Sequence, residues 1–177
     1  MIRRPLVAAA ILAACIAVVG CTRNSGGTSA SASTTYLEDV VPGYNSMLAE
    51  LRAAIGAEYP GVEWREDASG AEKVGGVAAD TWVVYSPTWY LDAPIADDSA
   101  RRDAVVRTAN AILHRHGFVS FQTVIAHPGQ FEYVADDRWG CRVVFGGLRI
   151  AGLSYRTGDM PSLDPTPQVP LRAEPTG

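Results

Sequence analysis

The sequence predicts an α+β fold, a two-layer sandwich in which two helices cover one face of an antiparallel sheet. Two segments carry apolar residues at helical spacing, and the remaining runs alternate apolar and polar residues as half-buried strands do. Short turns join these runs into hairpins, and hairpins build antiparallel sheets whose apolar face needs a helical cover. We expect the order α-β-β-α-β-β-β-β.

The first helix is expected around residues 44–58, because its apolar residues repeat along one helix face and Pro60-Gly61 then ends it. A second apolar face predicts a helix with an N-cap among Asp97, Asp98 and Ser99 and a C′ residue at Gly117. The two faces consist of Tyr44, Met47, Leu48, Leu51 and Ile55, and of Val105, Val106, Ala109, Ile112, Leu113 and His116.

Alternating runs predict two strands before the second helix, at residues 62–66 and 81–85. After that helix, residues 119–125 lead through a turn at Pro128-Gly129 to a strand at residues 131–134. A run at residues 141–145 is followed by a turn at Gly146-Gly147 and by a last strand from Leu148 onward.

Residues 1–20 are typical of a signal peptide that directs export. Arg3 and Arg4 supply positive charge, and the apolar segment at residues 6–19 is fourteen residues long. A transmembrane helix needs more, roughly 20 residues. The sequence Val18-Val19-Gly20-Cys21 resembles the lipobox of bacterial lipoproteins. In those proteins the signal peptide is removed before the cysteine, and the cysteine thiol receives a diacylglycerol.

Cys21 is the predicted lipidation site, although Leu12-Ala13-Ala14-Cys15 gives a second match. Cleavage before Cys15 would leave an apolar start, whereas cleavage before Cys21 leaves the polar stretch of residues 22–35. We therefore expect residues 21–35 to be a lipidated cysteine and a flexible tether. An ordinary secretory signal with an incidental cysteine is the alternative.

The predicted location is extracytoplasmic, with a lipid anchor in the plasma membrane. Loss of residues 1–20 leaves 13 basic and 19 acidic side chains, so the net charge of the mature chain is −6. A protein of that charge would not bind an anionic bilayer electrostatically, and its acidity excludes a typical nucleic-acid binder. Two or three acyl chains would provide stable anchoring instead.

Residues 36–158 are expected to form one domain, and the proline-rich residues 159–177 an extended tail. Cys141 is the other cysteine of the mature chain, so no intramolecular disulfide is expected. Its mid-strand position indicates a small buried apolar residue rather than a catalytic thiol.

No pattern typical of catalysis, cofactor binding or metal binding stands out, and we expect neither a cofactor nor a metal. His114 and His116 are two residues apart on a helix and point in different directions, and His127 belongs to a hairpin turn. The chain has no Gly-x-Ser-x-Gly elbow and no phosphate-binding loop. The prominent carboxylates fall at expected helix caps and turns; they are Asp97, Asp98, Asp103, Asp136 and Asp137.

The segment at residues 86–91 is unusual, because Pro87 breaks the preceding strand and large apolar side chains follow. A loop of this kind either covers the core or contacts a ligand or partner. Trp82, Trp89 and Tyr90 are therefore the candidate contact residues, and core covering is the alternative.

Five segments of the chain match a pattern shared by one family. They are Val18-Val19-Gly20-Cys21, Tyr59-Pro60-Gly61-Val62-Glu63-Trp64, His116-Gly117-Phe118, Phe131-Glu132-Tyr133 and Thr157-Gly158-Asp159. On these segments the chain resembles the LppA-like lipoproteins of actinobacteria. The resemblance implies the fold and an envelope location, with no functional site beyond Cys21. Family members often carry two further cysteines, after the tryptophan and beside the final Gly-Asp, and this chain has neither.

We expect a membrane-anchored, non-catalytic envelope lipoprotein whose domain binds another envelope component. The alternative is a carrier or sensor of a hydrophobic ligand held between sheet and helices, which requires a cavity of roughly 300–1,000 Å³. The least favoured alternative is an envelope hydrolase acting on cell-wall glycans through two carboxylates about 5–10 Å apart.

Overall fold

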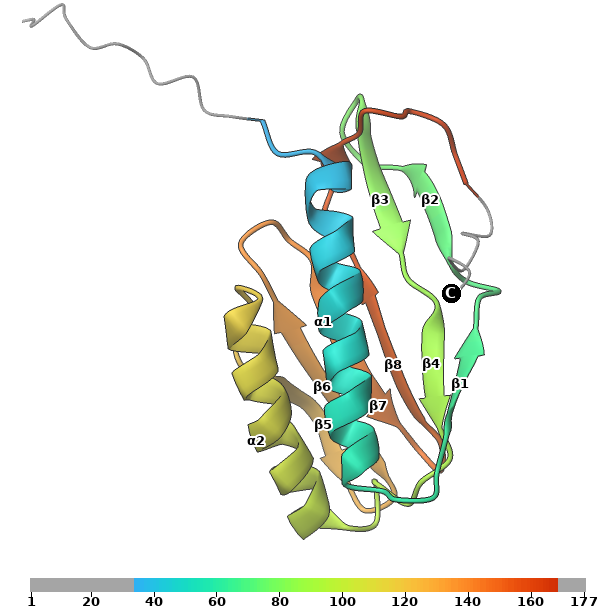
Figure 1. The fold of residues 1–177 in the computed structure, drawn as a ribbon, viewed down its shortest axis with the longest axis vertical. Coiled ribbons are helices and arrows are strands. Elements are labelled where there is room, and N and C mark those ends of the chain that lie inside the picture. Colours follow the sequence, from blue (N-terminus) through green and yellow to red (C-terminus); the bar gives the residue numbers. More distant parts are fainter. Residues whose placement is uncertain (1–33, 169–177) are drawn as a thin grey trace, which may run out of the picture. The chain divides into compact units, whose positions relative to one another are not determined.

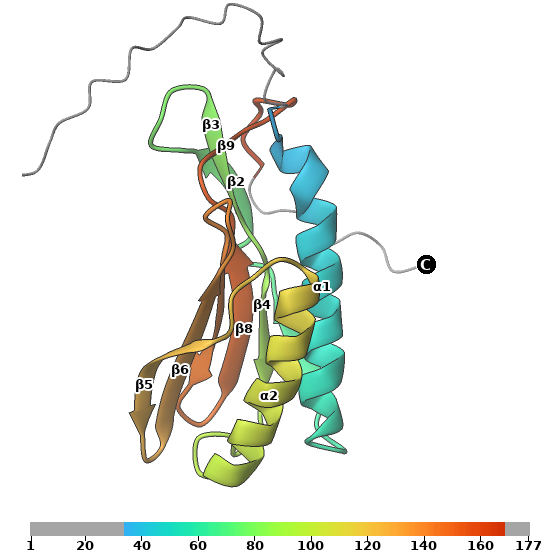
Figure 2. The ribbon, with the colours of Figure 1, turned by 90° about the vertical axis from the view of Figure 1, so that its left-hand side faces the viewer.

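The computed structural model describes residues 34–168, which form two helices packed on one face of a nine-stranded sheet. Figure 1 looks onto the helical layer, and Figure 2 shows both helices on the same side of the sheet. Helix α1 is Leu37–Ala57 and helix α2 is Ser99–Arg115. The strands are β1 (Trp64–Asp67), β2 (Glu72–Gly75), β3 (Thr81–Tyr85), β4 (Thr88–Leu91), β5 (Gln122–His127), β6 (Gln130–Asp136), β7 (Arg142–Gly147), β8 (Ala151–Arg156) and β9 (Met160–Pro161). The predicted α+β class with helices on one sheet face is confirmed.

All strand pairs are antiparallel, and the main path of the sheet is β1-β4-β8-β7-β6-β5. β3 joins beside this path and pairs with β2, with β9 and with the end of β8. β3 and β4 lie end to end along β8, separated by Ser86-Pro87. Ser86 bridges this break, because its N–H donates to the carbonyl of Tyr155 at 2.9 Å and its Oγ accepts the N–H of Tyr155 at 2.8 Å.

The order of elements differs from the prediction, because four strands precede α2 where two were expected, and β9 follows β8. β2 was missed because its four residues include a glutamate, a lysine and a glycine, which are unfavourable in strands. β4 was missed because it follows Pro87 directly. Trp89 and Tyr90 consequently lie in a strand and not in a loop.

Helix α1 begins about two turns earlier than its apolar pattern indicates, at Leu37. Pro42 and Gly43 interrupt the helical pattern in the sequence, but Pro42 lies inside the helix. A proline there removes one backbone hydrogen bond and costs helix stability, so packing must hold the first turns in place. The five predicted apolar residues of this helix are all buried, and Leu37 extends the same buried face.

The turn between β7 and β8 lies two residues later than predicted. Gly146 and Gly147 belong to β7, and residues 148–150 make the turn. Neither glycine has a positive φ. Gly147 is required for a different reason, since a Cβ there would overlap the carbonyl oxygen of Ile150. By contrast, the turn at Pro128-Gly129 is where the sequence predicts it, with Gly129 at φ +76°.

The core fills the space between the helices and the sheet. Phe131, Phe145 and Leu153 from the sheet are at most 1% exposed, and Leu51 and Leu113 from the helices are fully buried. Cys141 is also fully buried, as expected for a small apolar residue, and burial raises the pKa of its thiol.

Residues 159–168, which the proline-rich sequence predicts to be part of an extended tail, contribute to the folded domain. Met160 is buried and pairs with Trp82, and the backbone of Gln168 exchanges hydrogen bonds with that of Lys73 at 2.8 and 3.1 Å. Within the described part of the chain, neither helix is long and apolar enough to cross a membrane.

Candidate functional site

The three aromatic candidates do not form one site. Trp89 lies on the helix side of the sheet, with the guanidinium of Arg52 3.4 Å from its ring centre. Tyr90 lies on the opposite face, where it covers Gly152. Trp82 shares the helix side but belongs to β3, beside Lys73. The predicted grouping of these residues is therefore not seen, whereas Trp82 and Trp89 both pack against the core.

The predicted capping role is seen for Asp98, whereas Asp103 lies inside α2 and Asp136 lies at the end of β6. The Asp98 carboxylate accepts the N–H of Arg101 at 2.9 Å and so caps α2, and Gly117 has φ +82° after the last turn. His116 Nε2 lies 2.9 Å from Glu50 on α1. Among residues 34–168, no three His, Cys, Asp or Glu side chains are grouped to hold a metal ion.

Asp137 shows how such a carboxylate can also hold the layers together. Its Oδ1 accepts the N–H groups of Trp139 and Cys141 at 2.8 Å each, which fixes the turn between β6 and β7. Its Oδ2 accepts the hydroxyl of Tyr44 at 2.5 Å, which ties that turn to α1. Burial, together with this hydrogen bond, raises the pKa of Tyr44, so its hydroxyl is a donor at neutral pH.

A pocket of about 340 Å³ lies between the first turns of α1 and the hairpin of β2 and β3. Its apolar wall comes from Leu37, Val41, Pro42 and Val84, and its polar wall from Glu38, Lys73, Asp164 and Gln168. None of the three aromatic candidates lines this pocket. A second pocket, of about 480 Å³, lies on the other side of residues 162–165 and includes Trp82 in its wall.

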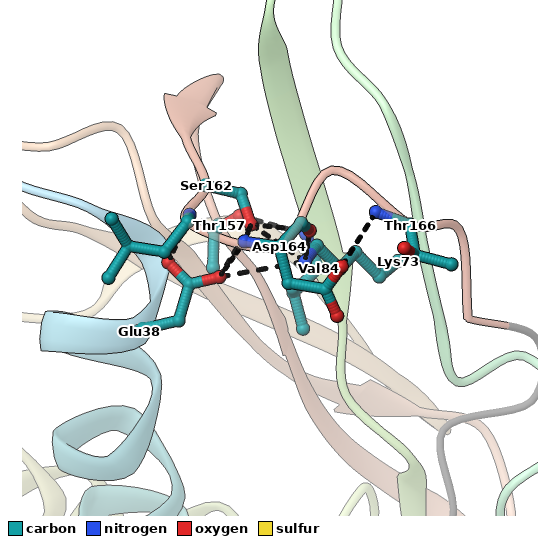
Figure 3. Close-up of polar contacts among 8 residues, drawn as sticks. Glu38, Lys73, Val84, Thr157, Ser162, Asp164 and Thr166 are labelled. Atoms are coloured by element: carbon teal, nitrogen blue, oxygen red, sulfur yellow. Dashed lines mark hydrogen bonds and ion pairs between the residues drawn. The ribbon is translucent and has the colours of Figure 1, made fainter.

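Lys73 is the single lysine of the chain and is 5% exposed. Its ammonium donates to Ser162 Oγ at 2.7 Å and to the carbonyl of Asp164, and it lies 3.6 Å from Glu38 Oε1 (Figure 3). We call Glu38, Lys73, Ser162 and Asp164 the Lys73 cluster. A buried ammonium is tolerated only when acceptors surround it, and here three oxygens do so.

The carboxylate of Glu38 is held by the C-terminal segment. It accepts the hydroxyl of Ser162 at 2.5 Å and the N–H of Leu163 at 3.0 Å. Partial burial raises the pKa of Glu38, but the hydrogen bonds from Ser162, Leu163 and Asp164 outweigh burial and lower the pKa to about 2. Glu38 is therefore ionised at neutral pH and joins the start of α1 to residues 162–164.

The segment Thr157-Gly158-Asp159 follows β8 and leads to Ser162 and Asp164 of the Lys73 cluster. Thr157 Oγ1 accepts the N–H of Val84 at 2.9 Å, which closes the sheet beside β8. Gly158 lies against the backbone of Trp139 and Gly140, where a Cβ would overlap the carbonyl of Trp139. Asp159 Oδ1 accepts the N–H of Val77 at 3.1 Å and so fixes the loop between β2 and β3. These three residues therefore act in folding.

The Lys73 cluster was not predicted from the sequence. Ser162 lies 89 residues after Lys73 and 124 residues after Glu38, and both Ser162 and Asp164 sit in a proline-rich stretch. The one available signal was the single lysine, placed between a glutamate and a valine in a chain that otherwise uses arginine.

The contacts of the Lys73 cluster are those of a stabilising polar network and not those of a catalytic dyad. Ser162 Oγ accepts a hydrogen bond from the Lys73 ammonium, and a protonated ammonium has no lone pair with which to take the proton of the serine hydroxyl. A glycosidase-type general acid needs a raised pKa, whereas the pKa values of both carboxyls in the pocket, Glu38 and Asp164, are lowered.

Two solved structures share this fold. The candidate lipoprotein LppA from Mycobacterium tuberculosis matches with a TM-score of 0.57 and 10% identity, over 71% of this chain and 78% of that chain. A DUF4853 family protein from Actinomyces odontolyticus matches with a TM-score of 0.51 and 16% identity, over 74% of this chain and 72% of that chain. No family model matches the sequence, and comparison with curated proteins finds no match either. The fold that the sequence resemblance implied is confirmed.

Proposed function

We propose that this protein is an LppA-like envelope lipoprotein, anchored to the plasma membrane through acyl chains on Cys21. Its domain would act by binding another envelope component and not by catalysis. The observation that carries the proposal is the lipobox-like Val18-Val19-Gly20-Cys21, followed by a polar stretch that leads into the folded domain. Cys21 itself lies outside the described residues.

The shared fold supports this proposal. The structure of LppA is described as that of a candidate lipoprotein, and this chain matches it over most of its described residues. The two chains differ at nine positions in ten, so the match adds to the evidence from the N-terminal sequence and does not replace it.

The non-catalytic part of the proposal is supported by the chemistry of the larger polar groupings. The Lys73 cluster is internally satisfied, Asp137 serves the turn between β6 and β7, and Cys141 is buried. A domain of this kind can act through its surface, and a tether leaves that surface free to meet a partner.

Membrane fractionation of cells that produce the full chain tests the anchor. The wild-type protein should sediment with membranes, and Cys21→Ser should leave more than nine-tenths of the folded protein in the soluble extracytoplasmic fraction or unprocessed. Cys15→Ser is the matched control and should behave as wild type. The proposal fails if Cys15→Ser abolishes anchoring, or if Cys21→Ser sediments unchanged after carbonate washing.

Binding of a hydrophobic ligand is a second candidate function, and the pocket beside α1 is the observation that favours it. Its volume of about 340 Å³ falls within the usual range for ligand sites, and four apolar side chains line it. The pocket lies beside the start of α1 and not under the aromatic residues of β4.

A fluorescent fatty acid titrated into the delipidated protein tests this second function. Val41→Trp should fill the pocket and weaken binding at least tenfold, whereas Val106→Trp on α2, which is also partly buried but outside the pocket, should not. Equal affinity in both variants would exclude this pocket as the binding site.

A further inference from the structure

We propose that the end of the domain at which α1 begins faces the lipid bilayer, and that exposed apolar side chains at this end contact neutral lipid. We call Val77, Ala78, Ala79 and Leu163 the tether-end surface. The inference rests on the proposed anchoring through Cys21 and adds to it an orientation and a lipid-contacting surface.

The tether-end surface lies next to the point where the described chain begins. Residue 34 is three residues before α1, and Leu163 donates its N–H to Glu38 in the first turn of α1 at 3.0 Å. Ala78 lines the same pocket as Ser162, so the β2–β3 loop is a neighbour of Leu163. Figures 1 and 2 both show this loop at the end where α1 starts.

Two apolar side chains of this surface are largely exposed, and hydrogen bonds hold the backbone of the β2–β3 loop in place. Val77 is 96% exposed and Leu163 is 66% exposed. The N–H of Val77 donates to Asp159 and the N–H of Gly76 to the carbonyl of Thr81 at 2.8 Å. A fixed loop that presents apolar side chains to water gains free energy when those side chains enter an apolar phase.

The length of chain before the domain brings this end close to the membrane. Twelve residues separate Cys21 from Thr34, and a Ser/Gly-rich chain of that length has a root-mean-square span of about 20 Å. Helix α1 has 21 residues and is therefore about 32 Å long. An anchor at Cys21 therefore keeps the start of α1 nearer to the lipid than the opposite end of the domain.

The charges at this end select neutral lipid. Asp80 and Asp164 are exposed there, whereas the lysine of this region, Lys73, is buried. Anionic headgroups would be repelled by the two aspartates, while zwitterionic headgroups would not. The contact is therefore a shallow apolar one, and it depends on the anchor for its strength.

Methyl NMR on the mature chain, residues 21–177, tests the proposal. Cys21 is coupled to a maleimide lipid in phosphatidylcholine nanodiscs that carry a gadolinium-chelating lipid, while Cys141 is buried and protected from coupling. We expect the methyl signals of Val77 and Leu163 to broaden at least threefold more than those of Leu148 and Ile150, which lie in the turn between β7 and β8. Equal broadening at the two ends, or greater broadening at Leu148, would overturn the proposal.

A pair of substitutions distinguishes direct lipid contact from the closeness to the bilayer that the tether alone would produce. Val77→Asp should reduce the broadening of Leu163 at least twofold, and the matched Leu148→Asp should leave it unchanged. Replacing about a third of the phosphatidylcholine by phosphatidylglycerol should also reduce it. If Val77→Asp has no effect, the surface does not contact lipid and is free for a protein partner. Because the anchor is supplied chemically, these outcomes do not depend on whether cells attach lipid to Cys21.

Discussion

The two ends of the domain are built in different ways. At the far end, short turns join neighbouring strands, with Pro128-Gly129 between β5 and β6 and residues 148–150 between β7 and β8. At the tether end, contacts join residues that are distant in sequence. Lys73 and Ser162 are 89 residues apart, and Glu38 and Leu163 are 125 residues apart.

This difference separates local from long-range determinants of the fold. A turn of two or three residues forms whenever its own backbone allows it, and its loss affects one hairpin. The tether end depends instead on a few polar contacts among three segments that meet only in the folded protein. Substitutions at the tether end should therefore lower the free energy of unfolding more than substitutions at the far end.

Removal of the buried lysine should have the largest effect. Lys73→Met leaves Glu38, Ser162 and Asp164 without their common donor, and we expect a loss of about 2–3 kcal/mol in the free energy of unfolding. The matched control is Arg101→Met at the start of α2. Its ion pair with Asp98 also spans 3.6 Å but is exposed, so the loss should be at most about 1 kcal/mol. Urea unfolding of both variants measures the difference, and equal losses would contradict the proposed asymmetry.

Crowding at Gly158 should have the next largest effect. Gly158→Ala places a Cβ against the carbonyl of Trp139 and should cost about 1–3 kcal/mol in stability. Gly75→Ala is the control, since nothing lies within 4 Å of a Cβ there and its φ is not positive. Thermal unfolding should show a clearly lower Tm for Gly158→Ala and an unchanged Tm for Gly75→Ala. A Tm of Gly158→Ala equal to that of wild type would mean that the backbone at Gly158 can move away from Trp139 with little loss of stability.

Neutralisation of Glu38 should have a smaller, pH-dependent effect. The pKa of Glu38 is lowered from 4.5 to about 2 in the folded protein, so its stabilising effect is fully present above about pH 5 and is lost as the pH falls towards 2. Because this carboxylate is partly exposed, we expect Glu38→Gln to cost only about 1–2 kcal/mol at pH 7.

The pH dependence of the lost stability tests whether the charge of Glu38 is its cause. Urea unfolding of wild type and Glu38→Gln at pH 7 and at pH 2.5 should show the difference in stability shrinking towards zero at the lower pH. A difference that stays constant with pH would mean that the side chain acts through packing and not through its charge.

Substitution of exposed residues at the far end should have the smallest effect. Leu148 is 60% exposed in the turn between β7 and β8, so Leu148→Ser should change stability by less than about 0.5 kcal/mol. Chemical denaturation measures this, and a loss above 1 kcal/mol would show that the turn has a packing role.

Much of the fold could be predicted from the sequence where local patterns suffice. The periodic apolar residues of α1 are buried, as are those of α2 apart from the partly buried Val106. Asp98, Gly117 and Pro128-Gly129 mark element ends as predicted. β2 was missed because three of its four residues are unfavourable in strands, and β4 was missed because it follows Pro87 directly. The turn after β7 was misplaced because Gly147 is needed for close backbone approach and not for a positive φ.

The candidate site was less predictable, because its residues come together only through the tertiary fold. Ser162 and Asp164 lie in a proline-rich stretch that resembles a tail, and Glu38 lies ahead of a proline that resembles a helix stop. Conversely, Trp82, Trp89 and Tyr90 are close in sequence but do not lie together in the fold. Strand alternation puts Trp89 and Tyr90 on opposite faces of the sheet, and the break at Pro87 places Trp82 in a different strand.

Mass spectrometry of the N-terminal peptide, from protein produced in a bacterium with lipoprotein-processing enzymes, is the direct test of lipid anchoring at Cys21. We expect a chain that begins at Cys21, with the mass of a thioether-linked diacylglycerol on that cysteine. A chain that begins at Cys15, or one in which the Cys21 thiol is unmodified, would contradict lipid anchoring at Cys21 and with it the proposed place of this domain at the membrane.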